Sequence, residues 1–452
     1  MTQLILWILV CLAVALVLRD RPMASVAMAV SLWFLVPTVG GYVLTGQASG
    51  GLAFHPATWL VIATVAMQVI HNGPRLAQVV AEHVVVFLAL GLVVSVAFVT
   101  TRFSSYGGGM NLLVDQILVP VLLLLLILEG ADRRWLLRLR DLIILLTTVA
   151  VAVAIAQWIV KEPIVYAAGF ESQYWFNPVH DRWMGTLDQP LALSLAVCVV
   201  TPLLAGVRHW WLRLPLLAVM FVGVLVSQSR LGLIVMIVGA LYVVGMSTKS
   251  AAARLVGMVL ASVAIVATAL SPLAAGVLDR VQDDTGSTRA RLLALDFFAR
   301  EWPDFLLTGQ GISSSYRIGS AAGLGTSLES AVLMYSIDIG IVFALLYFGT
   351  MVALLVTARR WVSMPGVMLA GAIAVIIPQT YSSLATRSVA GIVLWAVIGI
   401  AVADATIGRR TALALRPPRV VVARHASRRS AQVPVRLAPR SMPVRTARSS
   451  GP

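Results

Sequence analysis

Residues 278–319 have the sequence LDRVQDDTGSTRARLLALDFFAREWPDFLLTGQGISSSYRIG, and residues 327–341 have the sequence SLESAVLMYSIDIGI. The first segment combines Asp, Arg, Trp, Gly and Ser, and the second returns to an apolar run. Nearly everything before them, and the short segment after them, is apolar enough to lie in lipid. A chain of this kind can place such a polar segment only in water at one face of a membrane. We expect that face to be where the protein works.

The composition predicts an all-α, polytopic integral membrane protein. Hydrophobic residues make up 59% of the chain, charged residues 12%, and the mean hydropathy is +0.92. Soluble domains carry about 25% charged residues. The first apolar run has neither a basic segment before it nor a small-residue cleavage pattern ahead of Arg19, so we expect it to be the first span rather than a signal peptide. Cys11 and Cys198 both lie in apolar runs, where neither a disulfide nor a zinc site is expected.

The apolar runs predict about 12–13 transmembrane helices, because a span needs roughly 20 apolar residues. The expected spans are 2–18, 23–45, 58–71, 83–100, 112–129, 142–160, 189–206, 214–228, 231–246, 255–277, 328–357, 367–380 and 388–406. Basic residues in the short loops mark the cytoplasmic side. The N-terminus and the loops 46–57, 101–111, 161–188, 278–327 and 381–387 then face outward. This orientation requires residues 214–246 to be two spans that meet at Ser227-Gln228-Ser229-Arg230.

Two regions follow from the distribution of charge. Residues 1–408 form the polytopic membrane domain, whose large extracytoplasmic loop (278–327) should contain short helices. Residues 409–452 contain 11 arginines and no acidic residue, and subtracting these from the net charge of +15 leaves +4 for residues 1–408. This Pro/Arg-rich segment should be a disordered cytoplasmic tail attracted to anionic lipids of the membrane. No aromatic residue interleaves its arginines, so nucleic-acid binding is not expected.

Arginines on the outer side oppose the topology rule and need a local reason. Arg230 follows Ser227-Gln228-Ser229 and should lie at the outer end of a hairpin, either as an interfacial arginine or as a ligand for a lipid phosphate. Arg289 and Arg291 follow Ser287 and Thr288, which can cap a helix. Arginines beside free N–H groups at a helix N-terminus suit an anion. The alternative is that they pair with nearby aspartates.

Carboxylates accompany these arginines. Glu329 lies where the chain re-enters the membrane, and a partly desolvated carboxylate is a better proton acceptor. The alternative is an interfacial carboxylate paired with a loop arginine. Asp338, inside the apolar run, is expected to be structural. A metal site at Asp283-Asp284 is not favoured, because paired acids are common in polar loops.

Two outer segments have ordinary explanations. The glycines of 308–326 predict a flexible polar loop, and TGQGISSS lacks the lysine and the strand–helix context of a nucleotide-binding P-loop. Loop 161–188 contains Trp175, Phe176, Arg182 and Trp183. Aromatic residues beside an arginine suit sugar stacking, although tryptophans also collect at membrane interfaces.

Short motifs in one order resemble the O-antigen ligase/polymerase family of bacterial envelope glycosyltransferases. Ser229-Arg230-Leu231-Gly232 resembles the family's Ser-Arg-Gly turn. RARLLALDFFAREWPDFLLTGQG, residues 289–311, resembles its order of Arg, amphipathic helix, Pro and Gly-x-Gly. ESAVLMYSIDIGI, residues 329–341, resembles the stretch that re-enters the membrane, and RWMGTL, residues 182–187, is a fourth match. Ligases of the family usually carry His-Asn where this chain has Glu329-Ser330, which favours the polymerase-like members.

The resemblance implies a metal-independent, cofactor-free glycosyltransferase in the bacterial inner membrane. It would move or polymerise a glycan from a polyprenyl-diphosphate-linked oligosaccharide onto a hydroxyl of a glycan or lipid acceptor at the outer face. Arginine can bind a diphosphate in bidentate fashion. In this interpretation Arg230, Arg289 and Arg291 hold the diphosphate, Arg317 and Arg182 assist, and Glu329 is the base.

Two other classes compete with this interpretation. A transporter or flippase of lipid-linked sugars would place charges near the membrane midplane on broken helices, often in inverted repeats. The sequence shows no convincing repeat, and its polar residues concentrate in an outer loop. A non-catalytic protein of envelope assembly would use the basic tail as its docking arm.

Overall fold

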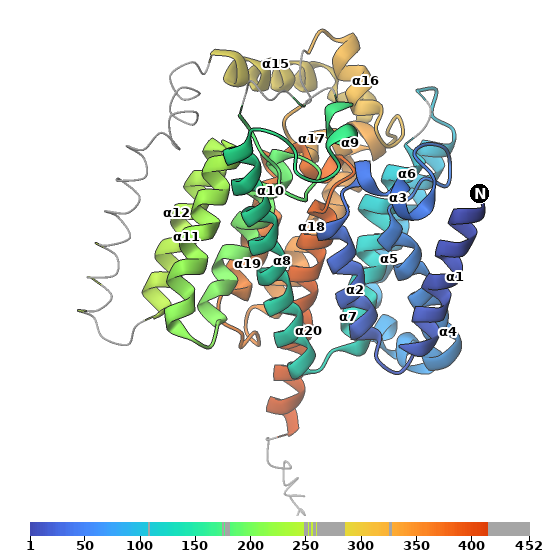
Figure 1. The fold of residues 1–452 in the computed structure, drawn as a ribbon. Coiled ribbons are helices and arrows are strands. Elements are labelled where there is room, and N and C mark those ends of the chain that lie inside the picture. Colours follow the sequence, from blue (N-terminus) through green and yellow to red (C-terminus); the bar gives the residue numbers. More distant parts are fainter. Residues whose placement is uncertain are drawn as a thin grey trace, which may run out of the picture.

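The computed structural model describes residues 1–106, 109–173, 176, 181–247, 252, 255, 259, 285–324 and 328–414. Every regular element among these residues is helical, which confirms the predicted all-α class. Long helices run up and down through a bundle, and shorter ones lie across one end of it (Figure 1). We call the end that carries the crosswise helices α15 and α16 the loop end. The opposite end, where α20 finishes, is the tail end.

The long helices keep the order in which the chain presents its apolar runs. They are α1 Thr2–Val17, α2 Pro22–Leu35, α4 Pro56–Glu82, α5 Val84–Arg102, α7 Val119–Gly130, α8 Arg133–Val160, α10 Pro190–Val200, α11 Trp210–Ser227, α12 Arg230–Ser247, α18 Ile341–Ala358, α19 Val367–Ile376 and α20 Ala390–Ala414. The shorter α-helices are α3 Tyr42–Thr45, α6 Met110–Leu113, α9 Ala167–Glu171, α15 Thr285–Glu301, α16 Ser314–Ala321 and α17 Ala331–Ile339. Single turns of other helix types are η1 Thr38–Gly40, η2 Val114–Leu118, η4 Thr201–Gly206, η5 Trp302–Phe305, η6 Ile377–Gln379 and η7 Ser382–Ala385.

Five described helices are long and apolar enough to cross a membrane by themselves, and a bent pair raises the number to six. Five further apolar helices are shorter than a full span. The chain is therefore a multi-pass membrane protein by length and composition. The expected span 255–277 lies outside the described residues.

Two of the expected spans are not single helices. The run 23–45 breaks after Leu35, and the chain then turns by 92° into η1 and α3. Pro37 accounts for this break, because the residue before a proline avoids helical geometry and the proline itself donates no hydrogen bond. The run 328–357 divides into α17 and α18 at Gly340, whose φ of 96° lies in the left-handed region. Only glycine adopts this geometry without strain.

The hairpin expected at residues 227–230 is confirmed. Helix α11 ends at Ser227, Gln228 caps it with a left-handed φ of 51°, and α12 begins at Arg230. The two helices lie side by side in Figure 1. The division on which the predicted orientation depends is therefore present.

Helix α20 lies at the centre of the bundle (Figure 1) and is buried from Ala390 to Ala405. Its Trp395 is fully buried, and the indole Nε1 donates to the Tyr347 hydroxyl at 2.7 Å. The peripheral helices α1 and α5 instead expose leucines and valines, as helices in contact with lipid do. Cys11 and Cys198 are buried single thiols, in agreement with their expected role as small hydrophobic residues.

Helix α20 continues to Ala414. The prediction that a disordered tail begins at Arg409 is therefore wrong for residues 409–414, which extend the helix. The physical reason is that charge alone does not end a helix: Arg409 and Arg410 are good helix formers and continue α20. Residues 415–452 lie outside the described part of the chain.

Candidate functional site

The segment that carries Arg182 is fastened to the hairpin that carries Arg230. Arg182 donates from Nε to the Ser227 carbonyl oxygen at 3.2 Å, and Gln228 donates from Nε2 to the Asp181 carbonyl oxygen at 3.1 Å. Arg230 begins α12 two residues later and is half-buried. Two segments that are far apart in the sequence, each carrying an arginine, therefore meet at the loop end.

A buried cluster of hydroxyl groups lies beneath this hairpin. The Tyr381 hydroxyl bonds to the hydroxyls of both Ser229 and Ser194, the latter at 3.0 Å. Burial raises the pKa of Tyr381, so its hydroxyl stays protonated. Gly232 completes the cluster, because a Cβ there would lie 2.1 Å from the Ser194 Oγ and 3.0 Å from the Tyr381 hydroxyl. The glycine of Ser-Arg-Leu-Gly is thus a requirement of packing.

The same tyrosine brings the Glu329 segment to the hairpin. The Ala331 amide donates to the Tyr381 carbonyl oxygen at 3.1 Å, and the Ser330 hydroxyl caps α17 by accepting from the Leu333 amide at 3.4 Å. Glu329 has a φ of 56°, in the left-handed region that non-glycine residues rarely adopt. Strained backbone of this kind costs about 1 kcal/mol and collects at functional positions.

Arg291 reaches Glu329 across the loop end. Its Nη2 lies 3.7 Å from the Glu329 Oε2, and the side chains are 46% and 24% exposed. This pair is the alternative that the sequence offered for Glu329. The aspartate expected nearby, Asp296, instead pairs with Arg300 at 2.9 Å. Asp283 and Asp284 lie outside the described residues.

Arg289 does not share the position of Arg291. Helix α15 begins at Thr285, so Ser287 and Thr288 lie inside the helix and do not precede it as caps. The predicted cluster at a helix N-terminus is therefore wrong, since Arg289 falls after the first turn. Residues two apart in an α-helix point to different sides. Arg289 is exposed, and no described carboxylate lies within 4.0 Å of it.

Arg317 lies on α16 and donates from Nη1 to the Tyr106 carbonyl oxygen, which ties α16 to the segment after α5. Among the described residues, the hydrogen bond of Arg317 is therefore to this segment and not to the Arg230 hairpin. Asp338 accepts from the Ser313 amide at 3.0 Å, the Ser314 hydroxyl at 3.1 Å and the Ser315 amide at 2.8 Å. These bonds agree with the structural role expected for Asp338.

The prediction of a flexible polar loop at 308–326 is wrong for residues 314–321, which form α16, and for residues 309–311, which pack against the end of α17. The Gln310 amide donates to the Ile337 carbonyl oxygen at 2.9 Å, and the Gly311 amide donates to that of Asp338 at 2.8 Å. A Cβ on Gly309 would lie 2.2 Å from the Asp338 backbone. The Gly-x-Gly pattern therefore allows two backbones to pack against each other. Trp183 is fully buried, so it is not available for sugar stacking.

Segment 381–389, which contains the expected outer loop 381–387, is largely buried and links several helices. Arg387 pairs with the buried Asp115, its Nη2 2.8 Å from the Oδ2. The Val389 amide donates to Asp188 at 3.1 Å, and the same carboxylate accepts from the amide and hydroxyl of Thr38, both at 2.6 Å. Burial raises the pKa of Asp188 to about 6. Further hydrogen bonds join Leu384 to Tyr335, Thr386 to Gln189 and Ser388 to Gln116.

The 381–389 segment thus forms no α-helix, although it is largely buried inside the bundle. Such backbone is tolerated because its polar groups are hydrogen-bonded within the protein.

Sequence reasoning missed Tyr381, Ser194, Asp188 and Arg387. Tyr381 and Arg387 stand in a nine-residue polar stretch that has the composition of a surface loop. A tyrosine followed by two serines carries no sign of the partners that it meets far away in the chain. One signal was available: Asp115 and Arg387 are opposite charges flanked by apolar runs, and such residues usually pair.

No family model and no curated protein matches this chain. The chemistry of the site therefore follows from its geometry. The loop end offers guanidinium groups on three segments (Arg182, Arg230 and Arg291) and the carboxylate of Glu329, which lies on a strained backbone and contacts Arg291. Such an arrangement can bind an anion and accept a proton beside it.

Proposed function

We propose that this protein is a glycosyltransferase of the bacterial cytoplasmic membrane. It transfers or polymerises a glycan from a polyprenyl-diphosphate-linked donor onto a hydroxyl acceptor, for the synthesis of cell-surface polysaccharide. The motif order of the O-antigen ligase/polymerase family supports the class of reaction. In the proposed topology of 12–13 spans the loop end faces outward, and the arginines of the short loops lie at the tail end, in the cytoplasm.

The observation that carries the proposal is the contact between Arg291 and Glu329, with Nη2 and Oε2 separated by 3.7 Å. The Glu329 segment also meets the Arg230 hairpin through Tyr381, which bonds to Ala331 and Ser229. A cation for the leaving diphosphate and a base for the attacking hydroxyl are thus supplied side by side. These are the two groups that glycosyl transfer from a lipid diphosphate requires.

The proposed reaction uses the arginines of the loop end and the carboxylate of Glu329. The acceptor hydroxyl oxygen forms a bond to the anomeric carbon, and the bond between that carbon and the phosphate oxygen breaks. The diphosphate leaves with the electron pair and is held by Arg230 and Arg291, with Arg182 beside them. Glu329 takes the hydroxyl proton. Arrival of the diphosphate draws Arg291 away from Glu329, which frees the carboxylate for the hydroxyl.

The experiment is to incubate purified protein with lipid-linked oligosaccharide and to measure donor consumption and glycan chain length. Glu329→Gln should lower the rate at least about 100-fold, the usual contribution of a general base. Glu301→Gln is the control. It changes an exposed carboxylate at the end of α15, the helix that carries Arg291, and should leave the rate unchanged. Wild-type activity of Glu329→Gln, or of alanine replacements at Arg230 and Arg291, would remove the assignment.

A flippase for lipid-linked sugars is the second candidate, because two of the expected spans are broken. The breaks fall after Leu35 and at Gly340. Transporters use broken helices at their binding sites. In reconstituted vesicles a flippase would move the donor between leaflets without lengthening its glycan, whereas the proposed enzyme would lengthen it.

A further inference from the structure

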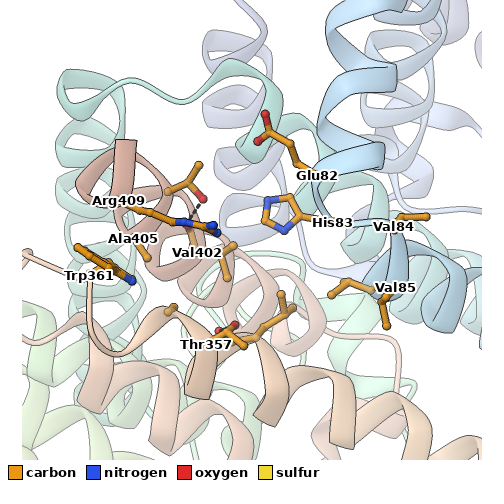
Figure 2. Close-up of a pocket in the computed structure, with 13 residues that line it drawn as sticks. Glu82, His83, Val84, Val85, Thr357, Trp361, Val402, Ala405 and Arg409 are labelled. Carbon is orange, nitrogen blue, oxygen red and sulfur yellow. Dashed lines mark hydrogen bonds between the residues drawn. The ribbon is translucent and has the colours of Figure 1, made fainter. Parts of the chain in front are cut away.

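A cavity of about 360 Å³ opens at the tail end, remote from the loop-end site. It lies where the junction of α4 and α5 meets the last turns of α18 and α20 (Figure 2). The side chains of Val84, Val85 and Val86 form one wall, and Leu354 and Val402 contribute to the others. The walls are therefore mostly hydrocarbon.

The mouth of this cavity is polar and carries one cation in excess. Glu82 is neutralised by Arg410, whose Nη2 lies 2.9 and 2.8 Å from its two carboxylate oxygens. Arg409 remains, and in Figure 2 it points toward His83. No carboxylate of the described chain lies within ion-pair distance of Arg409. Trp361, 37% exposed, lies on the same rim.

We propose that this cavity binds an anionic phospholipid, with the phosphate at Arg409 and His83 and an acyl chain along Val84–Val86, Leu354 and Val402. Arginine and a histidine N–H are donors to phosphate, and tryptophan favours the depth of the headgroups. Basic pockets between membrane helices bind anionic headgroups in this way.

The chemistry of the cavity disfavours other occupants. A free anion would leave the hydrocarbon walls uncovered, which costs about 25 cal/mol for each Å² of apolar surface. The chain's own segment 415–452 contains arginines and no acidic residue, so it would be repelled by Arg409. A phospholipid pairs its phosphate with Arg409 and covers the apolar walls with an acyl chain of the same molecule.

The test measures binding of phosphatidylglycerol and of phosphatidylcholine with identical acyl chains to the full-length protein in detergent, by native mass spectrometry. Arg409→Gln should weaken phosphatidylglycerol binding about tenfold and phosphatidylcholine binding less, because the choline ammonium already offsets the phosphate of phosphatidylcholine. Arg360→Gln is the matched control, because Arg360 is an exposed arginine after α18 that does not line the cavity. Its phosphatidylglycerol affinity should stay within about twofold of wild type.

A second variant fills the cavity without changing charge. Thr357 is exposed on its rim, and its hydroxyl bonds only within α18, so Thr357→Trp should block lipid while the melting temperature in neutral detergent stays that of wild type. Glycerol phosphate, which has the anion but no acyl chain, should not compete. Equal losses for Arg409→Gln and Arg360→Gln would show surface attraction only and overturn the proposal. Competition by glycerol phosphate, or unchanged binding to Thr357→Trp, would also overturn it.

Discussion

At the scale of single residues, Tyr381 makes hydrogen bonds to two separate parts of the site. Its hydroxyl meets Ser229 and Ser194, and its carbonyl accepts from the Ala331 amide at 3.1 Å. The first contact reaches the Arg230 hairpin and the second reaches the Glu329 segment. Removing only the hydroxyl should therefore loosen one half of the site while the other half stays attached.

Tyr381→Phe leaves two buried serine hydroxyls without their shared partner. We expect a loss of about 1–2 kcal/mol in the free energy of unfolding, together with a lower rate of glycan transfer, since Arg230 follows Ser229 directly. Tyr42→Phe, at a tyrosine that is 46% exposed, is the control and should change neither quantity. Denaturant titration in mild detergent and the transfer assay measure the two effects. An unaltered Tyr381→Phe protein would mean that the hydroxyl cluster does not hold the hairpin.

Two glycines on α12 give a second comparison. Gly232→Ala would place a Cβ 2.1 Å from the Ser194 Oγ, and overpacking of this kind costs about 1–3 kcal/mol. Gly245→Ala meets nothing within 4 Å and gains helix propensity, so it should be neutral or slightly stabilising. Melting temperatures of the two variants should move in different directions relative to wild type. Equal shifts would contradict the packing argument for Ser-Arg-Leu-Gly.

The sequence predicts the position of some site residues well and gives no indication of others. Arg230 at a hairpin tip follows from a polar tetrapeptide between two apolar runs, and the structure places it there. The partner of Glu329 could be predicted only as some loop arginine, because 38 residues separate it from Arg291. Tyr381 could not be predicted as a site residue, since its contacts depend on how α10, α12 and α17 pack.

At the scale of elements, the breaks in the apolar runs place polar backbone inside the bundle. The break at Gly340 lets residues 307–311 approach the end of α17, where the Gly311 amide bonds to the Asp338 carbonyl at 2.8 Å. The 381–389 segment is anchored through Arg387, whose guanidinium reaches Asp115 and the Ala53 carbonyl oxygen. Each break is therefore stabilised by hydrogen bonds from another element.

The pair of Arg387 and Asp115 can be tested by a double-mutant cycle. Asp115 is fully buried, so Arg387→Gln leaves an uncompensated carboxylate and should cost about 3–5 kcal/mol of unfolding free energy. Asp115→Asn combined with Arg387→Gln should cost less than the sum of the single changes.

The control for this cycle is the exposed pair of Arg300 and Asp296. Its side chains are 69% and 62% exposed, so Arg300→Gln should cost no more than about 0.5 kcal/mol. Additive effects of Arg387→Gln and Asp115→Asn would show that the buried pair does not act as a unit.

Element positions follow from the sequence better than their ends or their continuity do. Apolar runs located the long helices, because each run must satisfy its backbone inside the membrane. Apolarity alone did not show that 23–45 and 328–357 are interrupted, although Pro37 and Gly340 mark both breaks. Ser287 and Thr288 predict too late a start for α15, because both residues lie within the helix.

At the scale of the whole molecule, composition and charge predict the class and the arrangement of the two ends. The long helices run up and down through the bundle, and the loop end and the tail end lie at its opposite ends (Figure 1). What composition does not predict is which helix becomes central. Helix α20 is less apolar than its neighbours, yet it is surrounded because α7, α18 and α19 pack against it.

The orientation proposed for the two ends can be measured by cysteine labelling. The native thiols Cys11 and Cys198 are 2% and 0% exposed and should give little background. A membrane-impermeant maleimide should label Arg317→Cys from outside intact cells and Arg360→Cys only in inverted vesicles, because exposed positions at opposite ends face opposite compartments. Labelling of both variants from the same side would contradict the proposed topology. Labelling of Arg360→Cys from outside and of Arg317→Cys only in inverted vesicles would show that the orientation is the reverse of the one proposed.

The bonds of the 381–389 segment also affect which lengths of chain the fold accepts. Surface loops usually accept extra residues at little cost, because closing a slightly longer loop changes its entropy only slightly. Here the carbonyl of Tyr381, the guanidinium of Arg387 and the amide of Val389 each meet a fixed partner on a different segment of the chain. One added residue would move every later contact out of register. Homologous chains that share this architecture should therefore vary in length after α16 and keep the length of this segment constant.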